Sequence, residues 1–184
     1  MRNIYILKSD VTNYCSFVQK QGEENIMGIS RRMRWGPFKE NYRAIELEII
    51  SNDYGKKNYL FDFSSFLSPF FVVSDKCLNL IGNVLVPRGE VLPVITKSKR
   101  KKFFGYYPTN FLSGCLDLEK SEYKKYPNGL MIEKITLSGD KIKEEYLFTI
   151  EEDISRVFVT DKFKELVDKH ELKGFDFSSI VELS

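Results

Sequence analysis

The sequence holds few side chains of the kinds that attack electrophiles, transfer protons or bind metals. It has one histidine, His170, and three cysteines, Cys15, Cys77 and Cys115, which are far apart and form no Cys-x-x-Cys pair. A Cys–His nucleophilic pair would need His170 beside one of these thiols, and no local pattern surrounds any of them. The spacing indicates neither a zinc site nor a disulfide framework. We therefore expect buried thiols, and a histidine that interacts with the C-terminus of a helix.

Carboxylates can carry acid–base chemistry without histidine, so the acidic clusters are the next candidates. Asp117 and Glu119 lie two residues apart and would share one face of a strand. The acidic run at 151–153 lacks the glycine and the spacing of a calcium loop. No Gly-x-Gly-x-x-Gly or phosphate-binding loop occurs. We expect a solvated strand end and a solvated turn at these two places, with no catalytic residue, no metal and no cofactor.

Two basic segments are mixed with aromatic residues and suggest a binding surface. Residues 97–102 read Lys-Ser-Lys-Arg-Lys-Lys and precede an aromatic run at 103–107, and residues 31–35 read Arg-Arg-Met-Arg-Trp. Lysine and arginine can hold phosphates while aromatics stack on bases, which suggests nucleic acid. A continuous aromatic run must, however, point partly inward, and Arg and Trp are also favoured anchors of protein interfaces. The candidate partner-binding residues are Arg31, Arg32, Arg34, Trp35, Lys97, Lys99, Arg100, Lys101 and Lys102.

Composition and length indicate a single globular domain over residues 1–184. Hydrophobic residues make up 42% of the chain and aromatic residues 14%, which excludes a disordered chain and favours a core rich in β-sheet. No apolar run approaches the roughly 20 residues that span a bilayer, and the N-terminus lacks a signal-peptide pattern, so we expect a cytoplasmic protein. Residues 111–184 carry 11 basic and 16 acidic side chains, whereas residues 1–110 carry 17 basic and 10 acidic ones. The net positive charge therefore lies in residues 1–110.

Hydrophobic periodicity predicts an α+β fold, with a mixed or mainly antiparallel sheet and a few packed helices. We expect strands at 4–7, 44–50, 59–63, 70–73, 91–96, 103–107, 115–118, 157–159 and 175–177, and a hairpin of 131–137 with 145–150. Apolar residues at 11, 14, 15 and 18 suggest a helix capped by Ser9. Further helices are expected at 74–82, capped by Ser74 and ended by Gly82, and at 160–170, capped by Thr160.

One pattern occurs twice in the chain. Residues 71–76 and 157–162 share the order of an apolar strand, a hydroxyl residue, an acid and then an amphipathic helix. The acid would lie in the first turn of each helix, where the helix dipole favours negative charge. This echo predicts one strand–helix unit that is used twice within a single domain.

The order of these motifs resembles an immunity-protein superfamily that is encoded beside bacterial polymorphic toxins. The resemblance covers roughly residues 58–181, and residues 1–57 match nothing in it. It rests on Asp62-Phe63, Pro69, Val72-Val73-Ser74-Asp75-Lys76, Leu92-Pro93-Val94, Tyr106-Tyr107, Asn110, Cys115-Leu116-Asp117-Leu118-Glu119-Lys120-Ser121, Phe148-Thr149-Ile150, Val157–Val167 and Leu172-Lys173-Gly174-Phe175-Asp176-Phe177.

The resemblance implies a cytoplasmic antidote that binds one cognate toxin domain and blocks it by covering its surface, without catalysis. Its shared motifs look like fold features, so no toxin-contacting residue follows from it. The alternative is a nucleic-acid-binding or regulatory module that uses the basic loop at 97–102, and a carboxylate-based enzyme is a third reading. The identity and activity of the toxin, and the oligomeric state, do not follow from the sequence.

Overall fold

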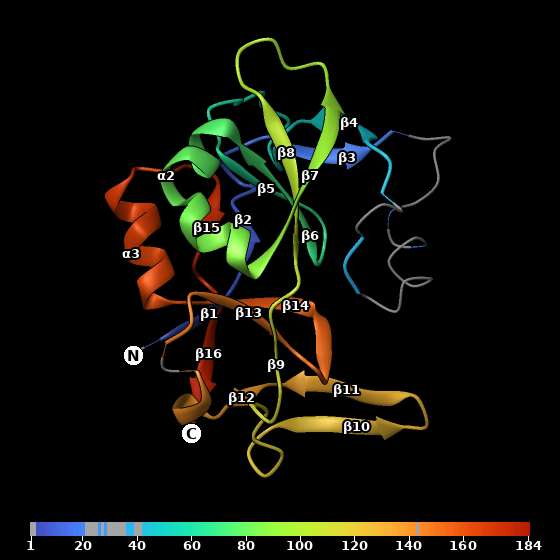
Figure 1. Ribbon diagram of the computed structural model, residues 1–184, viewed down its shortest axis with the longest axis vertical. Helices are drawn as coiled ribbons and strands as arrows, with labels where there is room; N and C mark the ends of the chain where they lie inside the picture. The colour runs from blue at the N-terminus through green and yellow to red at the C-terminus, as the bar shows by residue number, and fades with distance from the viewer. Residues whose placement is uncertain (1–2, 21–25, 27, 29–35, 39–41, 143) are drawn as a thin grey trace.

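Two six-stranded sheets and two helices form the framework of the part of the chain that the structure describes (Figure 1). This computed structural model describes residues 3–20, 26, 28, 36–38, 42–142 and 144–184. Strand dominates over helix, so the fold is α+β and mostly sheet, as the sequence predicts. Within the described residues, no helix is both long enough and apolar enough to cross a membrane.

The upper sheet in Figure 1 is curled. Its strands run in the order β3 (Ser16–Gln19), β4 (Ile45–Ile50), β7 (Gly89–Thr96), β8 (Phe103–Pro108), β6 (Phe70–Ser74) and β5 (Phe63–Leu67). All neighbours are antiparallel except β4 and β7. The curl brings the first strand near the last, where the Phe17 backbone N–H donates to Ser64 Oγ at 3.2 Å. The concave side of this sheet therefore holds a core of its own.

The lower sheet carries both the start and the end of the chain. Its order is β12 (Thr136–Leu137), β16 (Ile180–Leu183), β1 (Ile4–Ile6), β14 (Asp153–Thr160), β13 (Leu147–Ile150) and β9 (Phe111–Leu112). The β12–β16 and β13–β9 pairs are parallel and the others antiparallel. A separate hairpin of β10 (Glu122–Tyr126) and β11 (Gly129–Lys134) lies beneath it, and a short pair of β2 (Lys8–Ser9) and β15 (Phe175–Asp176) lies beside the upper sheet.

The central strands of both sheets are buried on both faces. On β6, Phe71 and Val73 enter a core that is shared by the two sheets and the helices, while Phe70 and Val72 enter the interior of the upper sheet. On β14, Val159 likewise faces the shared core and Phe158 faces the opposite side of the lower sheet. Strands that are buried on both faces read as continuous apolar runs instead of alternating ones. The shared core is what holds the two sheets together.

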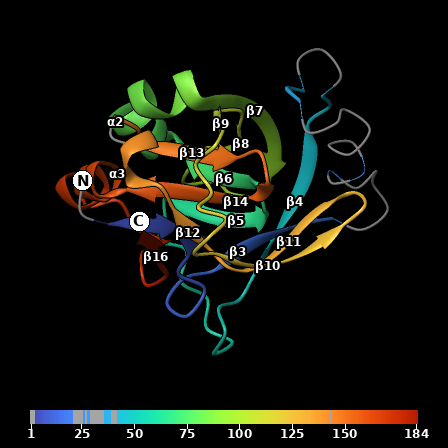
Figure 2. The ribbon, with the colours of Figure 1, turned by 90° about the horizontal axis from the view of Figure 1, so that it is seen from below.

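The twice-used strand–helix unit is present, with a difference at the caps. β6 leads into α2 (Asp75–Leu85) and β14 into α3 (Asp161–Lys169), and both helices lie on the side away from β3 and β4 (Figure 2). Ser74 Oγ accepts the Cys77 backbone N–H at 3.1 Å, as a capping serine does. Thr160 occupies the same position, but its hydroxyl donates to the Glu145 carbonyl at 2.8 Å and makes no cap bond.

The α2 helix passes the glycine at which the sequence places its end. It continues through Gly82 to Leu85 and then enters the 3₁₀ turn η2 (Val86–Arg88). Val84 and Leu85 are buried in the shared core, and that burial outweighs the cost of about 1 kcal/mol for a glycine inside a helix. A second 3₁₀ turn, η3 (Gly139–Lys141), follows β12.

The helix expected at residues 11–18 is absent. Residues 11–13 form a turn in which the Asp10 carboxylate accepts the Asn13 backbone N–H at 3.0 Å, and β3 follows. Cys15 and Phe17 are buried while Val18 is exposed, so the segment alternates and pairs with β4. Four apolar residues at helical spacing also fit a turn and a short strand, and pairing with β4 decides between the two.

The expected hairpin of 131–137 with 145–150 is also wrong. β11 pairs with β10, β12 pairs with β16, and β13 pairs with β14, so the two segments have different partners. The tight turn lies instead at residues 127–129, where Gly129 has a φ of +138°. Residues 115–118 form no strand, and only an isolated bridge joins Leu116 to Leu137. The β12–β16 pair joins segments that are distant in sequence, and local periodicity does not encode which strand becomes the neighbour of another.

We predict that the whole chain unfolds as one cooperative unit, because residues of both sheets and both helices meet in one core. Urea denaturation followed by circular dichroism and by tyrosine fluorescence should give coincident transitions. Limited proteolysis that released two fragments, each of which remained folded alone, would contradict the single domain.

Candidate functional site

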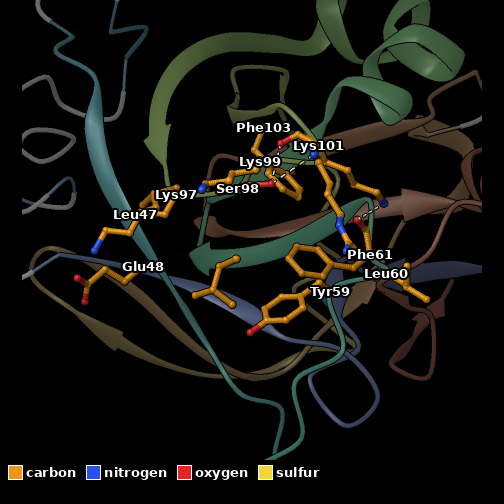
Figure 3. Close-up of a pocket in the computed structure, with 12 residues that line it drawn as sticks. Leu47, Glu48, Tyr59, Leu60, Phe61, Lys97, Ser98, Lys99, Lys101 and Phe103 are labelled. Atoms are coloured by element: carbon orange, nitrogen blue, oxygen red, sulfur yellow. Dashed lines mark hydrogen bonds between the residues drawn. The ribbon is translucent and has the colours of Figure 1, made fainter.

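A groove of about 710 Å³ opens between the last residues of β4 and the loop that follows β7 (Figure 3). One wall is Leu47, Glu48 and Ile49 of β4. The other walls are residues 59–61, which precede β5, and residues 97–101 together with Phe103 at the start of β8. The groove thus brings together the basic run at 97–102 and an aromatic segment that lies about 40 residues earlier in the chain.

The floor of the groove is apolar and is fixed by the core beneath it. Phe61 and Phe103 are buried and stack with their ring centroids 5.5 Å apart, and Phe17 meets Phe103 edge-on at 5.0 Å. Above this floor, Tyr59 and Leu60 are 50% and 71% exposed. A rigid apolar floor with large exposed side chains at its edge is a feature of surfaces that bind other molecules.

Most cations of the loop face solvent. Lys97, Lys99 and Arg100 are exposed, and within the described residues they have no hydrogen-bonding or ion-pair partner. Lys102 lies with its ammonium 5.0 Å from the ring centroid of Phe104. The groove lining contains one carboxylate, that of Glu48. The rim therefore carries an excess of positive charge.

Lys101 differs from its neighbours because its ammonium points inward. Its Nζ donates to the carbonyl of Phe61 at 2.7 Å and to Oδ1 of Asp62 at 2.8 Å. The loop is closed around it by Ser98, whose Oγ donates to the Lys101 carbonyl at 2.8 Å. Lys101 therefore holds the loop onto the segment that forms the opposite wall of the groove.

Asp62 is the buried anion that receives Lys101. Its Oδ1 also accepts the Ser74 hydroxyl at 3.0 Å, and its Oδ2 accepts the Lys173 backbone N–H at 3.1 Å and lies 3.6 Å from Lys76 Nζ. Burial alone would raise the pKa of this carboxyl, but the bonds from Lys101, Lys173 and Ser74 outweigh it and hold the pKa below its usual range. One carboxylate thus fixes the groove loop, the cap of α2 and the C-terminal segment together.

The C-terminal segment reaches Asp62 through a close approach at Gly174. The Asp62 backbone N–H donates to the Lys173 carbonyl at 2.8 Å. Gly174 has a φ of +98°, and a Cβ there would lie 2.3 Å from the Phe63 carbonyl oxygen. Glycine is required at this position by both conformation and space.

The other residues singled out by sequence lie away from the groove or outside the described part. Arg31, Arg32, Arg34 and Trp35 fall outside the described residues. The three cysteines are buried and unpaired, and burial raises the pKa of Cys77 to about 12. His170 is half-buried at the C-cap of α3. In the described part of the chain, no group of three His, Cys, Asp or Glu side chains is placed to hold a metal.

The paired-carboxylate candidate is a turn and not a strand. The Asp117 carboxylate accepts the backbone N–H groups of Glu119 and Lys120 at 3.0 and 3.1 Å, which closes a local turn. The pKa of Asp117 is lowered first by a hydrogen bond from the Ser184 hydroxyl and then by these two backbone bonds. Asp117 and Glu119 therefore do not share a strand face, because the aspartate side chain is bonded to the backbone of its own turn.

Sequence reasoning missed Tyr59, Leu60 and Ile49 as parts of the site. Residues 59–63 read as a continuous strand, whereas β5 begins only at Phe63 and residues 59–61 form the wall of the groove. The available signal was their position directly after a turn, which the Asn52 side chain closes by accepting the backbone N–H groups of Tyr54 and Lys56.

The comparison with known families gives a match that covers most of the chain. The model of an immunity protein family, Imm11, matches residues 29–182. The chain therefore belongs to this immunity protein family, and the match extends the sequence resemblance at 58–181 toward the N-terminus. A search of curated proteins gave no match.

We predict that Asp62→Asn lowers the free energy of unfolding by about 3 kcal/mol at pH 7, because it leaves Lys101 without its buried partner. A carboxyl with a depressed pKa stabilises the fold above its unfolded pKa of about 3.9, and that contribution is lost as the pH falls through the lower folded pKa. The gap between the two proteins should therefore be constant from pH 5 to 7 and close below pH 4.

Urea denaturation across this pH range measures the effect, with the exposed Asp53→Asn as the matched control. The control should change the free energy of unfolding by less than about 0.5 kcal/mol at every pH. Equal stabilities of Asp62→Asn and the parent at pH 7 would show that the Asp62–Lys101 contact does not hold the groove loop.

Proposed function

We propose that this chain protects a bacterial cell by binding one cognate toxin domain and covering its active site or another essential surface. The observation that carries this proposal is membership of the immunity protein family over residues 29–182. The mode of action needs no cofactor and no catalysis, and it takes place in the cytoplasm, where the toxin would act. The proposed partner is a protein and not a nucleic acid or a membrane.

We further propose that the toxin docks at the groove beside β4. The exposed Tyr59 and Leu60 lie next to cations that have no partner within the described residues. Charged rims steer association, and a few aromatic or arginine anchors supply most of the binding energy. Arg100 and Tyr59 are the anchors that this surface offers. Because the floor is held by buried aromatic stacking, the surface is formed before binding, which limits the entropy cost of association.

The two basic segments take different places in this proposal. Lys97, Lys99 and Arg100 are proposed contacts, together with Lys102 at the end of the loop. Lys101 contributes indirectly, since its ammonium is bonded to Phe61 and Asp62. Arg31, Arg32, Arg34 and Trp35 remain a second proposed contact from the sequence alone.

A nucleic-acid ligand is the second candidate, and the unpaired cations of the loop favour it. Base stacking would need exposed aromatic faces beside those cations. Phe103, Tyr106 and Tyr107 are buried, and Phe104 is half-buried beneath Lys102, so Tyr59 is the exposed ring in the groove lining. Binding to generic RNA that falls steeply with salt would support this alternative.

We predict that the chain inhibits the toxin stoichiometrically. When a fixed amount of the toxin domain encoded beside this chain is titrated with the chain, its activity should fall linearly and vanish near one chain per toxin. Occlusion requires each toxin molecule to be covered, whereas an enzyme that modified the toxin would act below that ratio and with time. Progressive inactivation at one chain per hundred toxins would contradict occlusion.

We predict that replacing Lys97, Lys99 and Arg100 together by Gln slows association with the toxin by about tenfold at low salt and changes dissociation less. Stopped-flow mixing at two salt concentrations measures both rates. The matched control replaces Lys120, Lys124 and Lys125, near and on the β10–β11 hairpin, by Gln, which removes equal charge elsewhere. A loss of rate that is the same in both triple variants would place the docking site outside the groove.

Two single variants separate binding from folding. Lys101→Gln should lower the free energy of unfolding, as Asp62→Asn does, and should slow association less than the triple replacement of Lys97, Lys99 and Arg100, because those three exposed charges remain. Trp35→Ala should speed dissociation by at least fivefold if the 31–35 segment is a contact. Full protection of cells by Trp35→Ala, with unchanged dissociation, would remove that segment from the interface.

A further inference from the structure

On its groove side, strand β4 continues beyond the point where its neighbour β7 ends. Its pairing with β3 continues to Ile50, opposite Ser16, whereas its pairing with β7 ends at Leu47, opposite Thr96. The chain leaves β7 there and forms the loop at 97–102. Within the described residues, the last three positions of β4 therefore have a strand on one side only.

The backbone of Ile49 faces this open side. The Glu46 carbonyl accepts the Lys20 backbone N–H at 3.0 Å on the β3 side of the strand. Backbone groups of successive residues in a strand point to alternate edges, so those of Glu48 and Ile50 also face β3. The N–H and C=O of Ile49 then point toward the groove, and Ile49 is one of its lining residues.

The groove occupies the position that β7 would fill if it continued beyond Thr96. Three residues of an extended chain span roughly 10 Å, which matches the length of β4 beyond Leu47. The apolar side chains of Tyr59, Leu60 and Phe61 lie at one side of this position, and the cationic loop lies at the other (Figure 3). An extended segment with alternating side chains would meet the apolar wall with one set and the cations with the other.

We infer that the toxin inserts an extended segment with alternating acidic and apolar side chains, which pairs with β4 at Ile49 as an added strand. This inference rests on the proposed function and names the chemistry of the docking segment. Its carboxylates lie against Lys97, Lys99 and Arg100, and its apolar side chains cover Tyr59 and Leu60. Backbone pairing supplies affinity, and the apolar and cationic walls supply specificity for the sequence of the segment.

Charge and backbone chemistry both select this occupant. Besides Lys101, which is paired with Asp62, three exposed cationic side chains line the groove against the one carboxylate of Glu48, so an acidic segment is attracted and a basic one repelled. An open strand edge offers an amide donor and a carbonyl acceptor at the spacing of another peptide backbone. A nucleic-acid backbone provides phosphate acceptors, and RNA adds ribose hydroxyls, but neither repeats the donor and acceptor spacing of a peptide backbone.

Amide hydrogen exchange measured by NMR tests the pairing at single residues. The probe is the toxin domain against which the unmodified chain restores growth, mixed with that chain at equimolar ratio. The Ile49 amide should exchange quickly in the free chain and at least tenfold more slowly in the complex. The Glu48 amide is the internal control, because it already faces β3 and should change less than twofold.

The outcomes separate this inference from the function on which it rests. If the unmodified chain neither restores growth nor forms a complex with any co-encoded toxin domain, the proposed function is wrong. If it does both and the exchange of the Ile49 amide stays unchanged, the function stands and the added strand is wrong. Slowing that appears with rising concentration of the chain alone, or with a 20-nucleotide single strand alone, would assign the edge to a second copy or to nucleic acid and would also overturn the inference.

Discussion

The buried ion pair between Asp62 and Lys101 is the interaction on which the arrangement of the groove depends. A carboxylate without water is costly unless charges and donors surround it, and Asp62 is met by an ammonium, a hydroxyl and a backbone N–H within 3.1 Å. Those donors come from the groove loop, from the cap of α2 and from the C-terminal segment. Because the anion must keep all of them, it sets the position of the loop relative to the sheet. The exposed cations of that loop are then presented on a fixed support.

Burial of both faces of the central strands is the second constraint, and it separates what the sequence predicts from what it does not. The strand at 70–74 and the helix that Ser74 caps are local patterns, and both were predictable from apolar runs and cap residues. Strand partners were not predictable, because periodicity does not say which strand becomes the neighbour: β11 pairs with β10, which directly precedes it, and β12 pairs with β16, which lies far along the chain. The helix predicted at 11–18 was wrong for the same reason, since pairing of β3 with β4 overrode the helical spacing of the apolar residues.

The candidate site was predictable in part. A run of five cations in six residues with aromatics behind it indicates a binding loop, and the structure places residues 97–101 at a groove. The inward turn of Lys101 was not predictable, because its partner Asp62 lies 39 residues away and is identified only by the fold. Tyr59 and Leu60 were missed since their apolar character resembles that of a buried strand. Folding thus divides one basic run into cations that are free to meet a partner and a cation that holds the loop in place.

Site-specific photo-crosslinking tests most directly whether the toxin binds at this groove. A photoreactive phenylalanine analogue at Tyr59, in the groove, is compared with one at Tyr126, on the β10–β11 hairpin, where the side chain is similarly exposed at 52%. Irradiation of each protein with the cognate toxin should give a covalent adduct from position 59 and little from position 126. An adduct from position 126 with none from position 59 would contradict the account, since it would place the toxin on the hairpin and leave the groove uncovered.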